Sequence, residues 1–353
     1  MFTKKTVKDL NVKGKRVLVR VDYNVPLTSG GKIEDDYRIT QSLPTLQYLL
    51  HKGAAIILCS HLGRPEGKVV PSMSLGPVAK RLHELLKLPV EFANDCVGPE
   101  TLEKAQALKP GQILLLENVR FHPEEEANDK KFAKELAALA DVFVQDAFGV
   151  VHHGAVSVSG LPTLLPSAAG LLLAKEVDTI TKVMREPERP MVAVVGGAKI
   201  ADKIDILKKF IEMADMVAIG GAMANTFLKA SGKNIGKSLC EDDLVPTAQA
   251  LMKKMTARGA TIPIALDVVC GKKFDAAEPA VLKDAGAVTD DDMIFDIGPK
   301  SAQELVDIIM KAGTVVWNGP VGVFEFDQFG EGTKAIAMAI ANTKAFTLAG
   351  GGD

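Results

Sequence analysis

Short apolar segments rich in β-branched residues alternate with helical patterns along the whole chain, and this alternation limits the fold more than any other feature. The segments typical of strands are residues 16–21, 54–59, 113–117 and 142–145 in the first half, and 191–195, 216–219, 261–266, 314–317 and 345–348 in the second. Between them, apolar residues such as Ile200, Ile204 and Leu207 recur with the helical period of about 3.6. Continuous apolar strands separated by helices predict parallel sheets covered by helices on both faces. Ligands of such sheets bind beyond the carboxyl ends of the strands.

The composition excludes several classes of protein. A length of 353 residues fits about two domains, and 47% apolar residues let each of them build a core. The net charge of −2 argues against proteins that bind nucleic acid or a membrane surface, since these usually carry a basic patch. No signal peptide is recognisable, and the longest apolar segment, residues 161–174, is too short to span a bilayer. The four cysteines form no CxxC pair, so we expect a protein of the reducing cytoplasm.

Residues 168–190 give the clearest domain boundary, because a helix-like segment ends at two prolines and a predicted strand follows at once. We expect an α/β protein of two Rossmann-like domains, each a parallel sheet covered by helices. A helix would join the two domains, with a cleft between them. The predicted bounds are 1–168 for the N-terminal domain, 169–188 for the linking helix and 189–353 for the C-terminal domain.

Arginine, histidine and Asp/Asn residues follow the predicted strands of the first half. They occur in RVDYNVP (20–26), SHLGRP (60–65), ENVRFHP (117–123) and DAFGVVHHG (146–154). We expect Arg38, Arg64 and Arg120 to lie together at the edge of the sheet formed by the carboxyl ends of its strands, which is called the rim below. Guanidinium groups bind carboxylate or phosphate with paired hydrogen bonds. Asp22 and Asn24 would bind a hydroxyl group of a sugar or acid. Each residue alone is more often a solvated surface charge, whereas their arrival at one rim favours an anion site.

Glycine-containing turns follow four predicted strands of the second half. They are VVGGAKIADK (194–203), AIGGAM (218–223), WNGPVGVFE (317–325) and LAGGGD (348–353). One such turn alone is more often a tight connection, but four in one domain favour a nucleotide site. Backbone N–H groups and helix N-termini bind phosphates there without a basic surface. No Walker-type loop and no GxGxxG fingerprint occurs.

Charged side chains complete the predicted nucleotide site. Lys199 and Lys203 lie four residues apart at the predicted start of a helix, so that they project from one face. Cations at a helix N-terminus oppose the helix dipole, which favours nearby phosphates over a merely solvated helix face. Glu325 would accept a hydrogen bond from a ribose hydroxyl group, and Asp353 is the natural carboxylate for a phosphate-bound Mg²⁺.

An anion site in one domain and a nucleotide site in the other imply phosphoryl transfer across the gap. Such transfer depends on positioning and on the neutralisation of charge by cationic side chains and Mg²⁺. It also requires that the domains close to exclude water, with the linking helix as the hinge region.

The motifs RVDYNVP, SHLGRP, LENVRFHPEEEAN, DAFG, VVGGAK, DKI and WNGPVGVFE stand in the order of the phosphoglycerate kinase family. The chain resembles this family from its first predicted strand to its last residue. The resemblance implies reversible transfer of the acyl phosphate of 1,3-bisphosphoglycerate to MgADP, which gives 3-phosphoglycerate and MgATP in glycolysis. It also implies a monomer.

The resemblance assigns roles to individual residues. Those that would bind the three-carbon acid are Asp22, Tyr23, Asn24, Arg38, His61, Leu62, Gly63, Arg64, Arg120 and His153. Lys199 would act in catalysis by stabilising the transferred phosphoryl group, with the help of Arg38. Those that would bind the nucleotide are Lys203, Asn318, Pro320, Glu325, Gly351, Gly352 and Asp353. Asp353 would also hold the Mg²⁺ ion.

Two departures from the family pattern qualify these expectations. After DAFG the chain has VVHHGA where the family has a segment like TAHRAH, so His153 takes the position of a substrate-binding arginine. The reference pKa of histidine is ~6.5, and a bound phosphate favours its protonated form. The family sequence also continues beyond GGGD, so we expect either a fragment or a truncated protein. For the chain as given, we expect a loose second domain and very low turnover.

There are two alternatives to the enzyme, of which one stays open and the other is disfavoured. A truncated, non-catalytic derivative of this kinase that binds the nucleotide or the acid is the main alternative. A nicotinamide-dependent dehydrogenase is disfavoured, because the glycine fingerprint is missing. Arg20 lies inside a predicted strand, and for this residue we expect a structural partner rather than a ligand.

Overall fold

The computed structural model describes residues 3–350, and the chain divides into two compact units, residues 1–181 and 182–353. The division falls within the helix α6 (Leu171–Arg185). The helix predicted for residues 169–188 is therefore present but shorter at both ends. It ends before Glu186, because the residue that precedes a proline, here Pro187, is disfavoured in the helical conformation.

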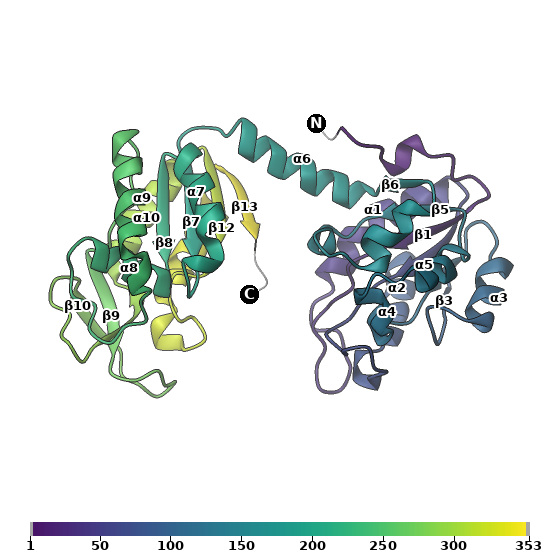
Figure 1. Cartoon of the computed structure of the whole chain (residues 1–353), viewed down its shortest axis with the longest axis horizontal. Helices are drawn as coiled ribbons and strands as arrows, with labels where there is room; N and C mark the ends of the chain where they lie inside the picture. Colours follow the sequence, from purple (N-terminus) through teal and green to yellow (C-terminus); the bar gives the residue numbers. More distant parts are fainter. Residues whose placement is uncertain (1–2, 351–353) are drawn as a thin grey trace. The chain divides into compact units, whose positions relative to one another are not determined.

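Unit 1 contains a six-stranded parallel sheet with the strand order β3-β4-β2-β1-β5-β6 (Figure 1). Its strands are β1 (Arg16–Arg20), β2 (Ala55–Cys59), β3 (Val90–Phe92), β4 (Ile113–Leu115), β5 (Val142–Gln145) and β6 (Ser167–Ala169). The sequence predicted the four inner strands. It missed the two edge strands, β3 and β6, because three residues are too few to form a recognisable pattern.

Helices cover both faces of this sheet. They are α1 (Tyr37–His51), α2 (Gly76–Leu86), α3 (Pro99–Ala107), α4 (Pro123–Glu126) and α5 (Lys130–Ala137). Successive residues of a strand point to opposite faces. Val17 and Val19 accordingly lie in one core cluster with α1 and α2, and Leu18 lies in another with α3 and α5.

Unit 2 contains a four-stranded parallel sheet with the order β13-β12-β7-β8. Its strands are β7 (Met191–Gly196), β8 (Met216–Gly220), β12 (Thr314–Asn318) and β13 (Phe346–Gly350). Its helices are α7 (Ile204–Met213), α8 (Ala222–Ala230), α9 (Val245–Ala257), α10 (Pro299–Lys311) and α11 (Glu331–Asn342). Buried residues of α7, α8 and α9 form the core on one face, and those of α10 and α11 form the core on the other.

A second, antiparallel sheet in unit 2 has the order β10-β9-β11 and was not predicted. It consists of β9 (Asp267–Gly271), β10 (Val281–Asp284) and β11 (Met293–Ile297). The strand predicted at residues 261–266 is wrong. Thr261 forms only an isolated bridge with Met216, and Pro263 has no N–H group with which to continue a ladder.

The predicted fold class is confirmed: the chain is an α/β protein with a parallel sheet in each unit, and helices lie on both faces of each sheet. Proline in the first turn begins α2, α3, α9 and α10, where its missing N–H group costs no helical hydrogen bond. Among residues 3–350, no helix combines the length and the apolar character that a membrane span requires.

Candidate functional site

The residues predicted to bind an anion follow β4, β2, β1 and β5, which are consecutive neighbours in the sheet of unit 1. Because these strands are parallel, their carboxyl ends meet at one edge. Side chains that follow them are thereby brought to the same edge although they come from distant parts of the sequence.

A continuous series of hydrogen bonds joins the segments that follow β1, β2 and β4 to the start of α1. Arg38 Nη1, near the start of α1, donates to Asp22 Oδ2 at 2.7 Å. The Asn24 N–H donates to the same carboxylate at 3.2 Å, and Asn24 Oδ1 accepts from the Gly63 N–H at 2.8 Å. The Gly63 carbonyl oxygen in turn accepts from Arg120 Nη1 at 3.0 Å. The side chains of Asp22, Asn24, Arg38 and Arg120 are therefore oriented before any ligand binds.

His61 lies at the centre of the positive charges of this rim. Arg20 Nη2 lies 3.1 Å from His61 Nδ1. A guanidinium group only donates, so Nδ1 accepts and Nε2 carries the proton of the neutral ring. Burial and, after it, the neighbouring charges of Arg20, Arg120, Arg38 and His153 together lower the pKa of His61 to about 2. His61 is thus a neutral N–H donor surrounded by cations.

Arg64 and His153 are exposed at the same rim. The charge of Arg64 lowers the pKa of Arg120, after the larger effect of burial. The pKa of His153 is also lowered from its ordinary value, first by burial and then by the charges of His152 and Arg120. Both side chains therefore lie within electrostatic reach of Arg120, which makes the rim attractive to an anion.

Two residues predicted for the acid site have their side chains in the core instead. Tyr23 is fully buried, and its hydroxyl group lies 2.9 Å from Ser42 Oγ. Leu62 is 4% exposed, and its carbonyl oxygen accepts a hydrogen bond from Asn118 Nδ2 at 2.7 Å. An apolar or aromatic residue beside a charged one in a motif fills the core behind the rim, which a motif alone does not reveal.

The structural partner expected for Arg20 is present. Arg20 Nε donates to Ser157 Oγ at 2.9 Å, and Ser157 donates to Glu125 Oε1 at 2.5 Å. All three side chains are almost completely buried. Since Arg20 also contacts His61, it positions a residue of the rim, which the sequence interpretation did not foresee. An arginine within an apolar strand was the only available signal.

We expect His61 to remain uncharged between pH 5 and 8, because its pKa is about 2. His153 should titrate in or below this range, at a pKa below its ordinary value. Long-range ¹H–¹⁵N spectra of the histidine rings measure both the charge and the tautomer. Protonation of His61 near pH 6, or a proton on its Nδ1, would contradict the arrangement with Arg20.

Unit 2 contains a large pocket, with a volume of about 920 Å³, at the carboxyl ends of its parallel strands. This volume falls within the range of ~300–1,000 Å³ that is typical of small-molecule sites. One side of the pocket consists of the turns that follow β7, β8 and β12, with Gly197, Gly221 and Gly319. Three of the four predicted glycine turns thus meet at one pocket, and Ala349 and Gly350 of the fourth also line it.

The glycines in these turns are required by the backbone. Gly221 has a φ of +66°, and a Cβ atom there would lie 2.6 Å from the Gly197 carbonyl oxygen. Gly319 has a φ of +98°, and a Cβ atom there would lie 2.4 Å from the Gly196 carbonyl oxygen. The turns after β7, β8 and β12 therefore approach each other more closely than any residue with a side chain permits.

The two lysines singled out from the sequence, Lys199 and Lys203, have different positions, and the prediction that they share one helix face is wrong. Lys199 is exposed and lies in the extended turn before the helix, whereas Lys203 ends a short 3₁₀ turn that precedes α7. Lys203 Nζ donates to the Gly196 carbonyl oxygen at 2.6 Å and to Asn318 Oδ1 at 2.7 Å. Gly197 extends the backbone after β7, which delays the start of the helix by several residues.

The opposite side of the pocket is apolar. Leu228, Val268, Phe274 and Phe295 line it, and the rings of Phe274 and Phe295 pack edge to face at 5.9 Å. A flat aromatic ring such as a nucleobase fits such a surface. The sequence interpretation missed this side, because Val268 and Phe295 come from the second sheet, which was not predicted.

Three residues predicted for the nucleotide site line the pocket: Asn318, Pro320 and Glu325. Asn318 Nδ2 also donates to the Gly350 carbonyl oxygen at 3.2 Å, which joins the ends of β12 and β13. Gly351, Gly352 and Asp353 lie outside the described residues. Their roles, including the metal site at Asp353, stay predictions.

Asp296 is a pocket residue that the sequence interpretation did not single out. It is 3% exposed, and burial raises its pKa to about 7. Its carboxylate accepts hydrogen bonds from the N–H groups of Gly332 and Ile297, both at 2.8 Å. It thereby fixes the N-terminus of α11 at the pocket.

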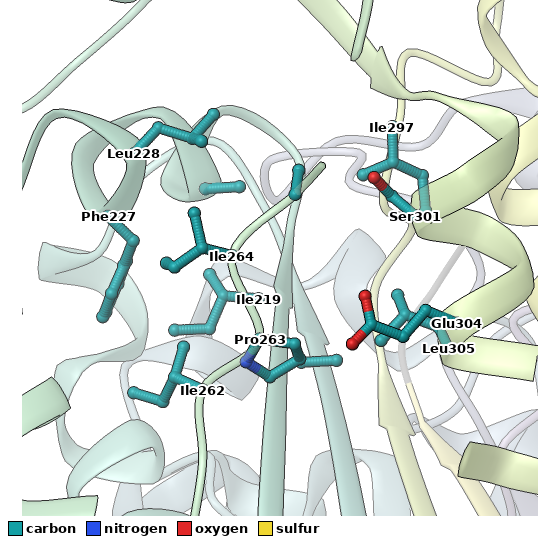
Figure 2. Close-up of a pocket in the computed structure, with 13 residues that line it drawn as sticks. Ile219, Phe227, Leu228, Ile262, Pro263, Ile264, Ile297, Ser301, Glu304 and Leu305 are labelled. Carbon is teal, nitrogen blue, oxygen red and sulfur yellow. The ribbon is translucent and has the colours of Figure 1, made fainter. Parts of the chain in front are cut away.

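A second hollow in unit 2 is too small for a substrate. Its volume is about 30 Å³, enough for a water molecule. Figure 2 shows that its lining is mostly apolar, with the carboxylate of Glu304 directed from α10 toward Pro263. The large pocket is therefore the candidate site of this unit.

Comparisons with known proteins agree with this geometry. A family model for phosphoglycerate kinase matches residues 7–353. Phosphoglycerate kinase of Moorella thermoacetica is 51% identical over 100% of this chain and 89% of that protein, and that of Thermomicrobium roseum is 49% identical over 99% and 89%.

Two solved structures of phosphoglycerate kinases have the same fold. The enzyme of Coxiella burnetii has a TM-score of 0.84 at 39% identity, and that of Pyrococcus horikoshii has a TM-score of 0.83 at 31% identity. Each match covers 99% of this chain and 88% of the other. The chain belongs to the phosphoglycerate kinase family.

Proposed function

We propose that this kinase catalyses the reversible transfer of a phosphoryl group from 1,3-bisphosphoglycerate to MgADP, which gives 3-phosphoglycerate and MgATP. One observation carries the proposal: the chain contains both an ordered cationic rim and a pocket built from glycine turns. The rim suits a small acid with a phosphate group, and the pocket suits a nucleotide. A kinase needs both kinds of site.

At the rim of unit 1, guanidinium groups of Arg38, Arg64 and Arg120 would bind the carboxylate and phosphate of the acid. His61 would donate its Nε2–H group, because the hydrogen bond from Arg20 occupies Nδ1 and the low pKa keeps the ring neutral. Asp22 and Asn24 would bind the hydroxyl group and hold the arginines. Tyr23, Leu62 and Gly63 would contribute through their backbone.

In unit 2, the turns with Gly197, Gly221 and Gly319 would bind the phosphates of the nucleotide through their N–H groups. The base would lie against the apolar side of the pocket, and Glu325 would accept a hydrogen bond from the ribose. Lys203, Asn318 and Pro320 would complete the site, together with Gly351 and Gly352.

Mg²⁺, when bound with the nucleotide, would neutralise charge on its phosphates. Asp353, the proposed ligand, lies outside the described residues, and no step of the transfer is derived through the ion. Lys199 is proposed to stabilise the transferred phosphoryl group, because it follows Ala198, which lines the pocket, and is exposed. Arg38, a residue of the proposed acid site, would support Lys199 in this role.

The proposed domains follow from these sites. Residues 1–168 would bind 3-phosphoglycerate, residues 169–188 would form the linking segment, and residues 189–353 would bind the nucleotide. A monomeric state and a location in the cytoplasm stay predictions of the sequence.

A turnover assay beside a binding titration tests the proposal. With 3-phosphoglycerate and MgATP, we expect release of ADP that a coupled enzyme assay detects, and binding of ADP by calorimetry. Binding of ADP or 3-phosphoglycerate without turnover would favour the non-catalytic alternative. Binding of neither ligand would overturn both.

We expect 3-phosphoglycerate to bind more weakly as the pH rises from about 6 to 8, because His153 loses its positive charge, its reference pKa being ~6.5. Its pKa in the free protein is lowered, so the loss of charge begins at a lower pH than the reference value implies. His153→Arg should tighten binding and flatten the dependence. The measurement is a calorimetric titration at several pH values.

The substrate phosphate itself ionises near ~6, so a matched variant must separate the two effects. His152 is an exposed neighbour of His153, with the two ring centroids 4.1 Å apart. His152→Arg adds the same charge one residue away. Equal profiles for the two variants would show that position 153 has no special place in the site.

A further inference from the structure

Unit 1 contains three different metal-binding side chains in one cluster, away from the residues to which a role has been given above. One ligand atom each of Asp95, Cys96 and His122 lies within 4.8 Å of the other two. Among the residues described, no other group of three such side chains lies as close together. Asp95 and Cys96 belong to the loop between β3 and α3, and His122 immediately precedes α4.

The three side chains are already held in place. The Thr101 hydroxyl group donates to the Asp95 carbonyl oxygen at 2.9 Å, which fixes the loop. The ring of His122 stacks on Phe132 with centroids 5.1 Å apart, and its Nε2 lies 2.7 Å from Asp95 Oδ1. An ion would therefore bind to a preformed site and would order little additional chain.

A hydrogen bond joins His122 and Asp95, and the Cys96 side chain packs beside them in the core cluster that contains residues of α3 and α5. Cys96 is 1% exposed, whereas the side chains of His122 and Asp95 are 27% and 53% exposed. The sulfur is therefore the innermost of the three ligand atoms, and the nitrogen and oxygen lie on the solvent side. An ion can enter from the solvent side and retain a water molecule as its fourth ligand.

The donor set selects the kind of ion. Thiolate and imidazole favour Zn²⁺ and similar transition metals, whereas Mg²⁺ and Ca²⁺ prefer a shell of oxygen ligands. Zn²⁺ binds nitrogen and oxygen at ~2.0–2.2 Å and sulfur at ~2.3 Å, usually in a tetrahedron. The ion would replace the proton shared by His122 and Asp95, and the two side chains would need to separate by less than about 1 Å.

We propose that Asp95, Cys96 and His122 form a binding site for Zn²⁺ or a similar transition-metal ion, separate from the Mg²⁺ of the nucleotide. The ion would link the loop after β3 to the segment that carries Arg120, two residues before His122. Binding would therefore stabilise unit 1 at one end of the cationic rim.

Titration of the nucleotide-free protein with Co²⁺ alone tests the site. Cobalt bound to a thiolate gives a charge-transfer band in the near ultraviolet, which cobalt bound only to oxygen does not give. We expect this band to saturate at one ion per chain, to disappear when Zn²⁺ is added, and to persist in excess Mg²⁺. Loss of an outer partner alone costs ~10–100-fold in metal affinity, so Cys96→Ser and His122→Gln should each weaken binding by ~100-fold or more.

Cys240 provides the matched control, since its thiol lies 3.3 Å from Asp242 Oδ1 but has no histidine in a cluster with it. Cys240→Ser should leave the band unchanged. No band in the parent protein, or a band that survives Cys96→Ser, would overturn the proposal. If Cys96→Ser does not fold, His122→Gln decides: its side chain is partly exposed, and an unchanged affinity in this variant overturns the site equally.

Discussion

In a chain extended with a family-like C-terminal segment, replacement of Lys199 by alanine is expected to lower kcat by ~10²–10³-fold, while the affinity for the nucleotide changes little. Lys199 is exposed in the turn after β7, beside the pocket, and no hydrogen bond or ion pair of its ammonium group is found among residues 3–350. Its charge is therefore available for the phosphoryl group in transfer. Lys203, in contrast, is bound to Gly196 and Asn318 and should contribute to the pocket itself.

Steady-state kinetics beside a calorimetric titration with ADP measures this prediction. An interaction made only in the transition state lowers kcat and kcat/KM equally, whereas one made with the bound substrate raises KM. Lys208→Ala, on the exposed face of α7, is the control and should leave both constants unchanged. If Lys199→Ala changes KM alone, Lys199 binds substrate and has no special role in the transfer.

The sequence was sufficient to predict the parallel sheets, because their inner strands are continuous apolar segments with a helix between each pair. It also identified the strands whose carboxyl ends carry the candidate site. Asp22 and Arg38 lie at the two ends of the connection between β1 and α1, and parallel pairing of β2 with β4 brings Gly63 and Arg120 into contact although they are 57 residues apart. Topology therefore converts separate short motifs into one rim.

The rest of the fold and of the candidate site depends on contacts between residues that are distant in the sequence. Local sequence patterns do not predict these contacts. The antiparallel sheet was missed because its strands are short and do not alternate regularly, and with it the aromatic side of the pocket was missed. Tyr23 and Lys203 belong to correct motifs, but one side chain is buried and the other lies outside the predicted helix face. A motif locates a segment, whereas the direction of each side chain depends on the local backbone.

The second large effect concerns stability and arises at Arg20, the buried arginine that the motifs left without a function. Its charge lies in the core of unit 1, and the nearest buried carboxylate in its hydrogen-bonded network is Glu125, reached through Ser157. The Ser157 N–H group donates to the same carboxylate at 3.0 Å. Glu125 therefore balances the buried charge and satisfies two donors at once.

Glu125→Gln is expected to lower the free energy of unfolding of unit 1 by ~3–5 kcal/mol, because removal of one partner leaves the charge of Arg20 buried and uncompensated. The amide group of glutamine also places its N–H donors toward the hydroxyl and N–H groups of Ser157, which are donors themselves. Glu124→Gln, at an exposed neighbouring position, should cost no more than ~0.5 kcal/mol.

Denaturant unfolding followed by the near-ultraviolet circular dichroism of tyrosine reports on unit 1, since all three tyrosines lie there and the single tryptophan, Trp317, lies in unit 2. Equal midpoints for the two variants would mean that solvent or another group compensates Arg20. In that case the orientation of His61 could not be attributed to a fixed network behind it.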